Sequence, residues 1–421
     1  MPKPTPRTAP ETPPEMLSET AQSPPADSDL ARFRAGEAYE LVVFDRLGDD
    51  ERTAFAELAG DPDFYGVLRP RAAAGGRHYR AVDRETALLL LTLAEPAPLP
   101  FFARGDGAAG GIAELVLDEV LEVEHHGAFV TGPAALPLLA ANASSAGGTA
   151  GAGAGSAAGH PLCRLAGEAL RYAAALGSDE PRRLAALLYD FNRLPATPGW
   201  EHRLADRGSV LAFLGYAAGS PQLAALRRGW EIGRPDDDGG WIHFTTRHGR
   251  ERGATAAAAS CKLYVSPPVE ALPQAFAALV AVLGRRPGAA FKVGADAAGL
   301  LRPDKLVAYF ADAESLLAVA RELEARLDGV AAHGVPFTAP IDAAGLLSWG
   351  VDPPTSLRPL SWQGPESWRT WLAGRLAVAL ARARAAGEGE QEACRFALAR
   401  VAREGVDVER WLPAADLFRA A

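Results

Sequence analysis

The chain has 421 residues, of which 48% are hydrophobic, and this is enough for two or three domains with sizeable cores. Its formal net charge is −9, which argues against non-specific binding to nucleic acid or to an anionic membrane as its main role. Cys163, Cys261 and Cys394 lie far apart and form no CxxC pair, so the sequence predicts neither a disulfide framework nor a metal site.

The sequence also lacks the signals of membrane insertion and export. No basic segment followed by an apolar run stands near residue 1, and no stretch reaches about 18 apolar residues. We therefore expect a cytoplasmic protein with no membrane partner. The wide spacing of the cysteines fits a reducing compartment.

The first half of the chain is predicted to be mostly helical. Residues 1–28 are rich in Pro, Thr, Glu and Ser and predict a disordered tail. Residues 29–141 form a helical N-terminal domain, with helices over 31–47 and 49–61, a third that Asp83 caps, and a fourth that ends near Leu121 before a hairpin around His126. Residues 142–160 are almost entirely Ala, Gly and Ser and predict a linker.

The second half is predicted to be α+β. Residues 161–225 form a helical segment, with Pro181 in the first turn of its second helix. Residues 226–360 form an α+β core with a central antiparallel or mixed sheet and helices on one face. Strands at 229–233 and 240–246 are joined by an Asp- and Gly-rich turn. A helix capped by Asp312 and two short strands follow, and residues 361–421 form a C-terminal helical layer.

The lysines are unevenly distributed. Only four occur, and Lys262, Lys292 and Lys305 fall within one window of 50 residues, 261–310. An arginine stays protonated, whereas a desolvated lysine can lose its proton and act as a base or nucleophile, or bind phosphate as a compact charge. Chance placement of surface lysines is the plainer interpretation, and the count alone does not decide between the two.

The window alternates in a way that places these lysines on one face. It predicts strands over 262–266, 289–293 and 305–310, with an amphipathic helix between the first two. If that helix covers the apolar face, the opposite face carries Lys262, Tyr264, Lys292, Lys305 and Tyr309. With the nearby Arg302 in the loop before the third strand, these side chains form a candidate anion site.

Other constellations give weaker signals. His125 and His126 have no further cluster of metal ligands near them in the sequence, so we interpret them as exposed histidines of a turn and not as a metal site. No nucleophile elbow surrounds Ser260, which argues against a triad with His333 and Asp352. Glycine-rich segments at 151–156 and 294–299 lack the residues of nucleotide-binding loops, and the acidic residues 236–238 read as a hairpin turn.

The lysine face suits removal of a proton next to a carbonyl carbon. Neighbouring cations and partial burial lower the pKa of a lysine, and the same cations hold a phosphate leaving group and stabilise an enolate. Tyr264 or His333 would protonate the leaving group. The sequence therefore indicates a lyase that acts on phosphoserine or phosphothreonine. A face that only holds an anionic partner is the alternative from another class, and a structural component with no ligand is a third.

Several short motifs resemble the HopA-type type III effector family. They are KLYVSPPVEALPQAFAALVAVL, AFKV, LLRPDKLVAYF, VPFTAPI, GLLSWGVDPP and ESWRTWLAGRLAVAL, preceded by LLYDFNRLPAT, SVLAFLGYA and RRGWEI, all between residues 187 and 386. The order of strand, helix, FKV and strand is also similar to the phosphothreonine lyase effectors. Members of this family encoded in class V lanthipeptide and thioamide-peptide clusters are assigned as phosphate-eliminating lyases.

The resemblance implies roles for individual residues. Lys292 matches the position of the lyase base, and Lys262 and Tyr264 match positions around the catalytic histidine, where this chain has a tyrosine. Arg302, Lys305, Tyr309 and His333 are the expected phosphate contacts. The resemblance further implies a phosphorylated peptide or protein substrate, a separate kinase, and no metal or cofactor. Residues up to about 182 match nothing in the family and are expected to recruit a partner or substrate.

Overall fold

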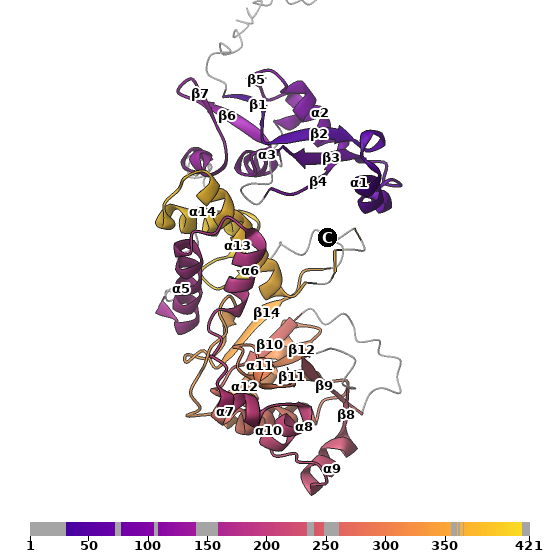
Figure 1. Ribbon diagram of the computed structural model, residues 1–421, viewed down its shortest axis with the longest axis vertical. Coiled ribbons are helices and arrows are strands. Elements are labelled where there is room, and N and C mark those ends of the chain that lie inside the picture. The colour runs from indigo at the N-terminus through magenta and orange to yellow at the C-terminus, as the bar shows by residue number, and fades with distance from the viewer. Residues whose placement is uncertain are drawn as a thin grey trace, which may run out of the picture.

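The computed structural model describes most of the chain. The described residues are 31–71, 77–104, 108–139, 159–233, 240–247, 261–354, 360, 363–364 and 366–414. The predicted tail (1–28), nearly all of the predicted linker (142–160) and most of the acidic turn near 236 lie outside them. The described residues form three parts stacked along one long axis: an N-terminal part, a middle layer of helices, and a large sheet with its own helices (Figure 1).

The large sheet has seven strands, and all of its pairings are antiparallel. Their order across the sheet is β13-β14-β10-β12-β11-β9-β8. The strands are β8 (Trp230–Ile232), β9 (Trp241–Thr246), β10 (Cys261–Val265), β11 (Ala290–Gly294), β12 (Leu306–Phe310), β13 (Ala339–Pro340) and β14 (Leu347–Val351). This confirms the predicted α+β class and the predicted strand, helix, strand, strand order of the window.

One face of this sheet is a closed hydrophobic core. The alternating side chains Leu263, Phe291 and Phe244 are fully buried there, and Phe244 stacks on Phe291 with ring centroids 4.6 Å apart. Two amphipathic helices, α10 (Leu272–Leu283) and α12 (Ala313–Arg326), pack against this face. Asp312 caps α12 by accepting a hydrogen bond from Ser315 N, as predicted. Shorter helices complete this part: α7 (Pro198–Arg203), α8 (Arg207–Phe213), α9 (Pro221–Gly229) and α11 (Ala297–Leu300).

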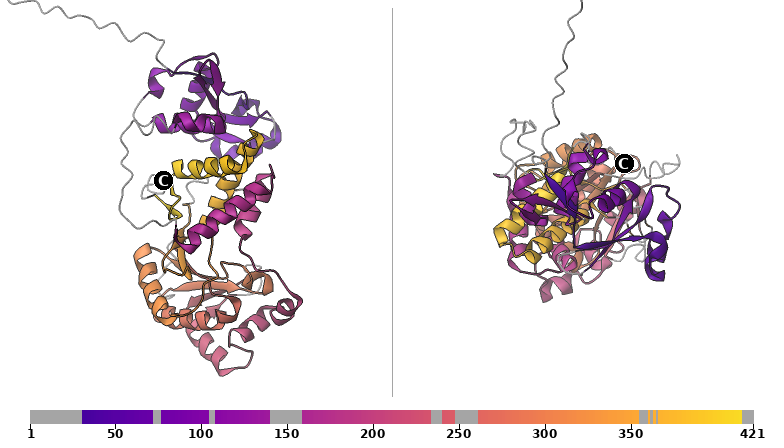
Figure 2. Two further views of the ribbon diagram at one scale, coloured as in Figure 1. Left: turned by 90° about the vertical axis from the view of Figure 1, so that its left-hand side faces the viewer. Right: turned by 90° about the horizontal axis from the view of Figure 1, so that it is seen from above.

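The middle layer is a bundle of four helices with its own core. They are α5 (Pro161–Ala175), α6 (Pro181–Asp190), α13 (Trp368–Ala385) and α14 (Glu390–Arg403). A side view shows them between the large sheet and the N-terminal part (Figure 2). The Trp-rich start of α13 is the predicted packing face, because Trp368 and Trp371 are buried and stack with centroids 5.4 Å apart. The C-terminal helical layer is thereby confirmed, and it closes with the short strands β15 (Val406–Asp407) and β16 (Leu412–Pro413).

The N-terminal part mixes strands with helices. The helix predicted over 31–47 is wrong, because this segment forms β1 (Arg32–Ala35) and β2 (Tyr39–Val43). Gly36 lies so close to the chain at Glu119 that any side chain would collide with its carbonyl oxygen, and Val42 and Val43 favour a strand. The Asp83 cap is confirmed, since its carboxylate accepts from Thr86 N. The other elements are α1 (Asp49–Ala54), β3 (Phe64–Pro70), β4 (Arg80–Asp83), α2 (Arg84–Thr92), β5 (Ala97–Pro98), α3 (Ala108–Leu117), β6 (Leu121–His125) and β7 (Ala128–Val130).

Two antiparallel sheets organise these strands, in the orders β5-β1-β6-β7 and β2-β3-β4. The predicted hairpin at His126 joins β6 to β7. Among the described helices, none is long and apolar enough to cross a membrane.

Candidate functional site

The lysines predicted to share one face of the sheet lie on the face opposite α10 and α12. In the observed register Lys262 lies opposite Tyr309, and Tyr264 lies opposite Val307, which in turn pairs with Lys292. Paired residues of antiparallel strands project to the same side of a sheet, so these side chains share one face. The shared face predicted from the alternation is confirmed for Lys262, Tyr264, Lys292 and Tyr309, and their roles stay predictions.

Lys262 is held by a carboxylate. Its Nζ lies 2.5 Å from Oδ2 of Asp352, and both side chains are mostly buried. The other oxygen of Asp352 accepts a hydrogen bond from Trp368 N at the start of α13. Asp352 therefore connects the lysine to the helical layer.

Lys292 lies on an aromatic surface. Its Nζ is 4.1 Å from the ring centroid of Trp241 and 6.0 Å from that of Tyr309, and the Nζ of Lys262 lies 5.8 Å from the same Tyr309 ring. Tyr309 thus stands between the two lysines. The guanidinium of Arg302 also contacts the Trp241 ring, at 5.0 Å. The indole of Trp241 therefore contacts both Lys292, the expected base, and Arg302, the expected phosphate ligand.

Arg302 is oriented by a buried network. Its Nε and Nη2 donate to the two oxygens of Asp304 at 2.9 and 3.0 Å, and Nη2 also donates to the hydroxyl of Tyr189 at 2.8 Å. Arg369 of α13 lies 2.8 Å from Asp304 through Nη1. Burial alone would raise the pKa of Asp304, but Arg369 and Arg302 lower it far below its usual range. Asp304 is therefore a permanent anion that fixes two guanidinium groups.

The charges on this face do not cancel. Among the described residues that these contacts join, the basic side chains Lys262, Lys292, Arg302 and Arg369 face two carboxylates, Asp304 and Asp352. Even with Lys292 left out of the count, the cations outnumber the carboxylates by one. This face is therefore suited to holding an anion.

Tyr264 lies beneath this face. Its side chain is only 2% exposed and packs with Val307 and Val335. Burial, reinforced by the charge of Asp352, raises the pKa of its phenol well above the usual value. The phenol is therefore neutral, and with the described residues it forms no hydrogen bond.

Lys305 and His333 are bonded to one another inside the protein. Lys305 is fully buried, and its Nζ donates to Pro267 O at 3.0 Å and meets His333 Nδ1 at 2.7 Å. His333 Nε2 lies 2.7 Å from Asn192 O, which requires the hydrogen to be on Nε2. Burial lowers the pKa of Lys305 to about 7, and burial together with Lys305 lowers that of His333 to about 4. Their polar atoms are thus occupied, and contact of either with phosphate would require these bonds to break.

Sequence reasoning missed most of the partners of Lys262 and Arg302. Trp241, Asp304 and Arg369 were not considered, and Asp352 was weighed only as part of a triad. Tyr189 and Arg369 reach the site from helices α6 and α13 and are separated by 180 residues. Only Asp304, two residues from Arg302 in the RPDK motif, carried a local signal.

The weaker constellations form no site within the described residues. No group of three or more His, Cys, Asp or Glu residues there could hold a metal ion. His125 and His126 lie at the β6–β7 turn, and Ser260 lies outside the described residues.

Comparisons with known proteins give distant structural similarities. No family model matches the sequence, and no curated protein matches it. An effector protein from Pseudomonas syringae pv. tomato is 12% identical, with a TM-score of 0.38, over 60% of this chain and 98% of its own.

Two solved structures named as phosphothreonine lyases are also similar in part. OspF from Shigella flexneri is 18% identical, with a TM-score of 0.25, over 42% of this chain and 95% of its own. The VirA (SpvC) effector from Chromobacterium violaceum is 20% identical, with a TM-score of 0.23, over 33% of this chain and 70% of its own.

Proposed function

We propose that this protein eliminates phosphate from phosphorylated Ser or Thr residues of a peptide or protein and leaves a dehydroamino acid. The observation that carries the proposal is the pairing of Lys292 with Arg302 on the ring of Trp241. A base and a fixed phosphate ligand thereby lie next to each other, as elimination of phosphate requires. The excess positive charge of this face supports the same substrate.

The reaction follows from this arrangement. Neutral Lys292 removes the proton from the α-carbon, and the electrons of that C–H bond form the new double bond to the β-carbon. The bond from the β-carbon to oxygen breaks, and its electrons leave with the phosphate. Arg302 and Tyr309 hold the departing oxygens. The ammonium of Lys262, which is paired with Asp352, supplies the proton that the phosphate takes.

Three further residues support the site in this scheme. Tyr264 fills the space beneath the substrate and keeps the face dry. Lys305 and His333 hold the start of β12 in place, since both are bonded to other parts of the chain. The scheme uses no metal ion and no organic cofactor.

The biological setting of the proposal rests on the sequence motifs alone. The AFKV and LLRPDKLVAYF segments resemble family members from lanthipeptide and thioamide-peptide clusters. We therefore infer that the substrate is a peptide under modification in a bacterial pathway. Because an eliminating enzyme does not phosphorylate, a separate kinase has to supply the phosphorylated peptide.

One observation favours a second candidate function. Tyr264 stands where the resemblance places a histidine, and its phenol is a poor acid because its pKa is raised. If elimination needs a proton donor at the position of Tyr264, the same cations would only bind a phosphorylated or acidic partner, without reaction. Catalysis and binding therefore predict different outcomes with the same peptide.

Mass spectrometry of a phosphothreonine peptide incubated with the protein separates the two functions. Elimination removes phosphoric acid, a loss of about 98 Da, and the product adds a thiol at the new double bond. We expect the loss with the wild-type chain and none with Lys292→Ala. An intact phosphopeptide that binds the wild-type chain would instead establish the binding function, and the absence of both results would refute both candidates.

A further inference from the structure

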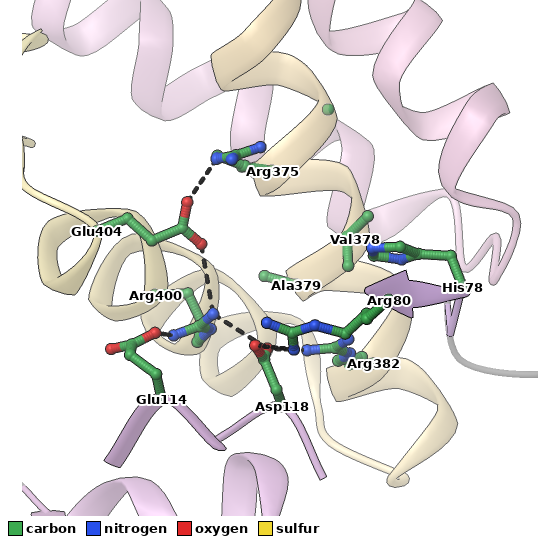
Figure 3. A pocket seen from close by; sticks show the side chains of 11 residues that line it. His78, Arg80, Glu114, Asp118, Arg375, Val378, Ala379, Arg382, Arg400 and Glu404 are labelled. Carbon is green, nitrogen blue, oxygen red and sulfur yellow. Dashed lines mark hydrogen bonds and ion pairs between the residues drawn. The ribbon is translucent and has the colours of Figure 1, made fainter. Parts of the chain in front are cut away.

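A second charged cavity lies far from the lysine face, between the N-terminal part and the helical layer. Its volume is about 590 Å³. Three regions of the chain line it: the segment at β4, the end of α3, and the facing sides of α13 and α14 (Figure 3). Its charged side chains are Arg80, Glu114, Asp118, Arg375, Arg382, Arg400 and Glu404.

Asp118 is the centre of the charged network around the cavity. Its carboxylate is paired with Arg80 from β4, with Arg382 from α13 and with Arg400 from α14, the last at 3.0 Å. Burial would raise the pKa of Asp118, but these three guanidinium groups hold it far below its usual range. Asp118 is therefore charged at every physiological pH.

Two further carboxylates complete the network. Glu114 pairs with Arg400 and Arg403, and Glu404 pairs with Arg375 at 2.5 Å. Arg375 also stacks on the ring of Trp371, with its guanidinium carbon 4.2 Å from the centroid. These contacts fix the arginines before any ligand arrives, so ordering them would cost little on binding.

The network carries more positive than negative charge. Four guanidinium groups of the lining (Arg80, Arg375, Arg382 and Arg400) share three carboxylates, and Arg403, which lies outside the lining and pairs with Glu114, brings the excess of the network to two positive charges within the described residues. This excess stands out in a chain whose net charge is −9.

Hydrogen-bond donors are also in excess. Within the described residues the buried Nε of Arg382 has no hydrogen-bond partner. Arg375 and Arg80 keep 41% and 33% of their side chains exposed, so their remaining N–H groups are accessible from the cavity. A site with surplus charge and fixed forks of N–H groups suits a tetrahedral oxyanion.

We propose that this cavity binds a phosphate dianion, either inorganic phosphate or a phosphate monoester, and that Arg375 and Arg80 are its main ligands. A dianion neutralises the excess charge of the network. Because Arg80 belongs to the N-terminal part and Arg375 to the helical layer, the bound ion connects the two. The site is separate from the lysine face and does not depend on the function proposed there.

Calorimetric titration of the full chain with inorganic phosphate tests the proposal. We expect a phosphate site that is weakened about tenfold or more in Arg375→Gln and unchanged in Lys292→Ala. Glu404→Gln should bind more tightly, because it removes a competing carboxylate; a variant that merely failed to fold could not give this result. The matched control Arg395→Gln removes an exposed arginine of α14 that, among the residues the structure describes, pairs with Glu392, and it should bind like the wild-type chain.

Two further titrations show where the ion binds and whether the ligand is free phosphate or a phosphate monoester. In Lys292→Ala the cavity is unchanged, so phosphate binding lost in that variant but kept in Arg375→Gln would place the ion on the lysine face and overturn the proposal. No heat at about 10 mM phosphate would overturn it too, because even a millimolar site would then be filled. A phosphothreonine peptide titrated into Lys292→Ala shows whether the site prefers the monoester or the free ion.

Discussion

Arg302 is held in position by contacts with buried neighbouring residues. Asp304 holds it by two hydrogen bonds and Tyr189 by one, while Trp241 covers its guanidinium. A guanidinium fixed in this way presents its remaining N–H groups in one direction, which a flexible arginine on the surface would not do. The site therefore depends on residues that never touch the substrate.

Tyr189→Phe should test this positioning directly. The ring stays and only the hydroxyl is lost, so Arg302 loses one bond while the fold is kept. If the lyase proposal holds, we expect kcat/KM to fall about tenfold, mainly through a higher KM. Tyr172→Phe changes an exposed ring of α5 and is the matched control. Equal kinetics for the two variants would show that the hydroxyl does not position Arg302.

His333 predicts a dependence of stability on pH. Its native pKa is about 4 against an ordinary value of 6.5, so the unfolded chain takes up a proton first as pH falls. The native state therefore loses stability between pH 6.5 and 4, by about 2 kcal/mol once partial exposure is allowed for. Urea unfolding of His333→Asn should lack this part of the decline. An unchanged pH profile in that variant would contradict the assignment.

At the scale of elements, the junction of β14 with α13 links the sheet to the helical layer. Trp368 at the start of α13 lies against Gly350 of β14, where a β-carbon would come within 2.7 Å of its ring. Its indole donates to Phe337 O at 3.1 Å. The same end of α13 donates to Asp352, the partner of Lys262. A shift of this helix would therefore move a site residue.

Gly350→Ala should disturb this junction. The added methyl group overlaps the buried ring, and we expect a loss of about 1–3 kcal/mol in the free energy of unfolding. Gly229→Ala, where nothing lies within 4 Å, is the matched control and should cost little. Thermal denaturation followed by circular dichroism compares the two. Equal stabilities would mean that the ring can move aside without cost.

The sequence predicted the local part of this architecture and not its long-range contacts. The alternation of KLYVS, AAFKV and KLVAYF placed Lys262, Lys292 and Tyr309 on one face, because a period of two is a property of the strand itself. Tyr189 and Arg369 reach Arg302 and Asp304 only after α6 and α13 pack together, and no spacing encodes that packing. The burial of Lys305 has the same cause.

The N-terminal strands were missed for a different reason. In residues 31–47 the apolar side chains also fit a helical spacing, and the short β1 and β2 give little alternation to oppose it. The close approach of Gly36 to Glu119 could be seen only in three dimensions.

At the scale of the whole molecule, a small set of buried ion pairs joins the N-terminal part to the helices. Asp118 lies just after α3 and contacts arginines of both α13 and α14. Buried pairs are screened little by salt, and removal of one partner leaves the others uncompensated. The attachment of the N-terminal part should therefore depend on this carboxylate.

Asp118→Asn should separate the unfolding of the two parts. We expect a loss of about 3–5 kcal/mol, with the N-terminal part melting before the rest in calorimetry. Asp190→Asn removes an exposed carboxylate that pairs with Arg193 and serves as the control. One cooperative transition at the wild-type temperature in Asp118→Asn would show that other contacts hold the parts together.

The central claim is that Lys292 acts as a base, and replacement of Lys292 by arginine tests it most directly. Arginine keeps the positive charge but cannot give up its proton at neutral pH. With a phosphothreonine peptide, we predict that Lys292→Arg retains binding within about tenfold of the wild-type chain and loses elimination by a factor of about a thousand or more. Elimination that survives in Lys292→Arg would contradict the claim and show that this position supplies only charge.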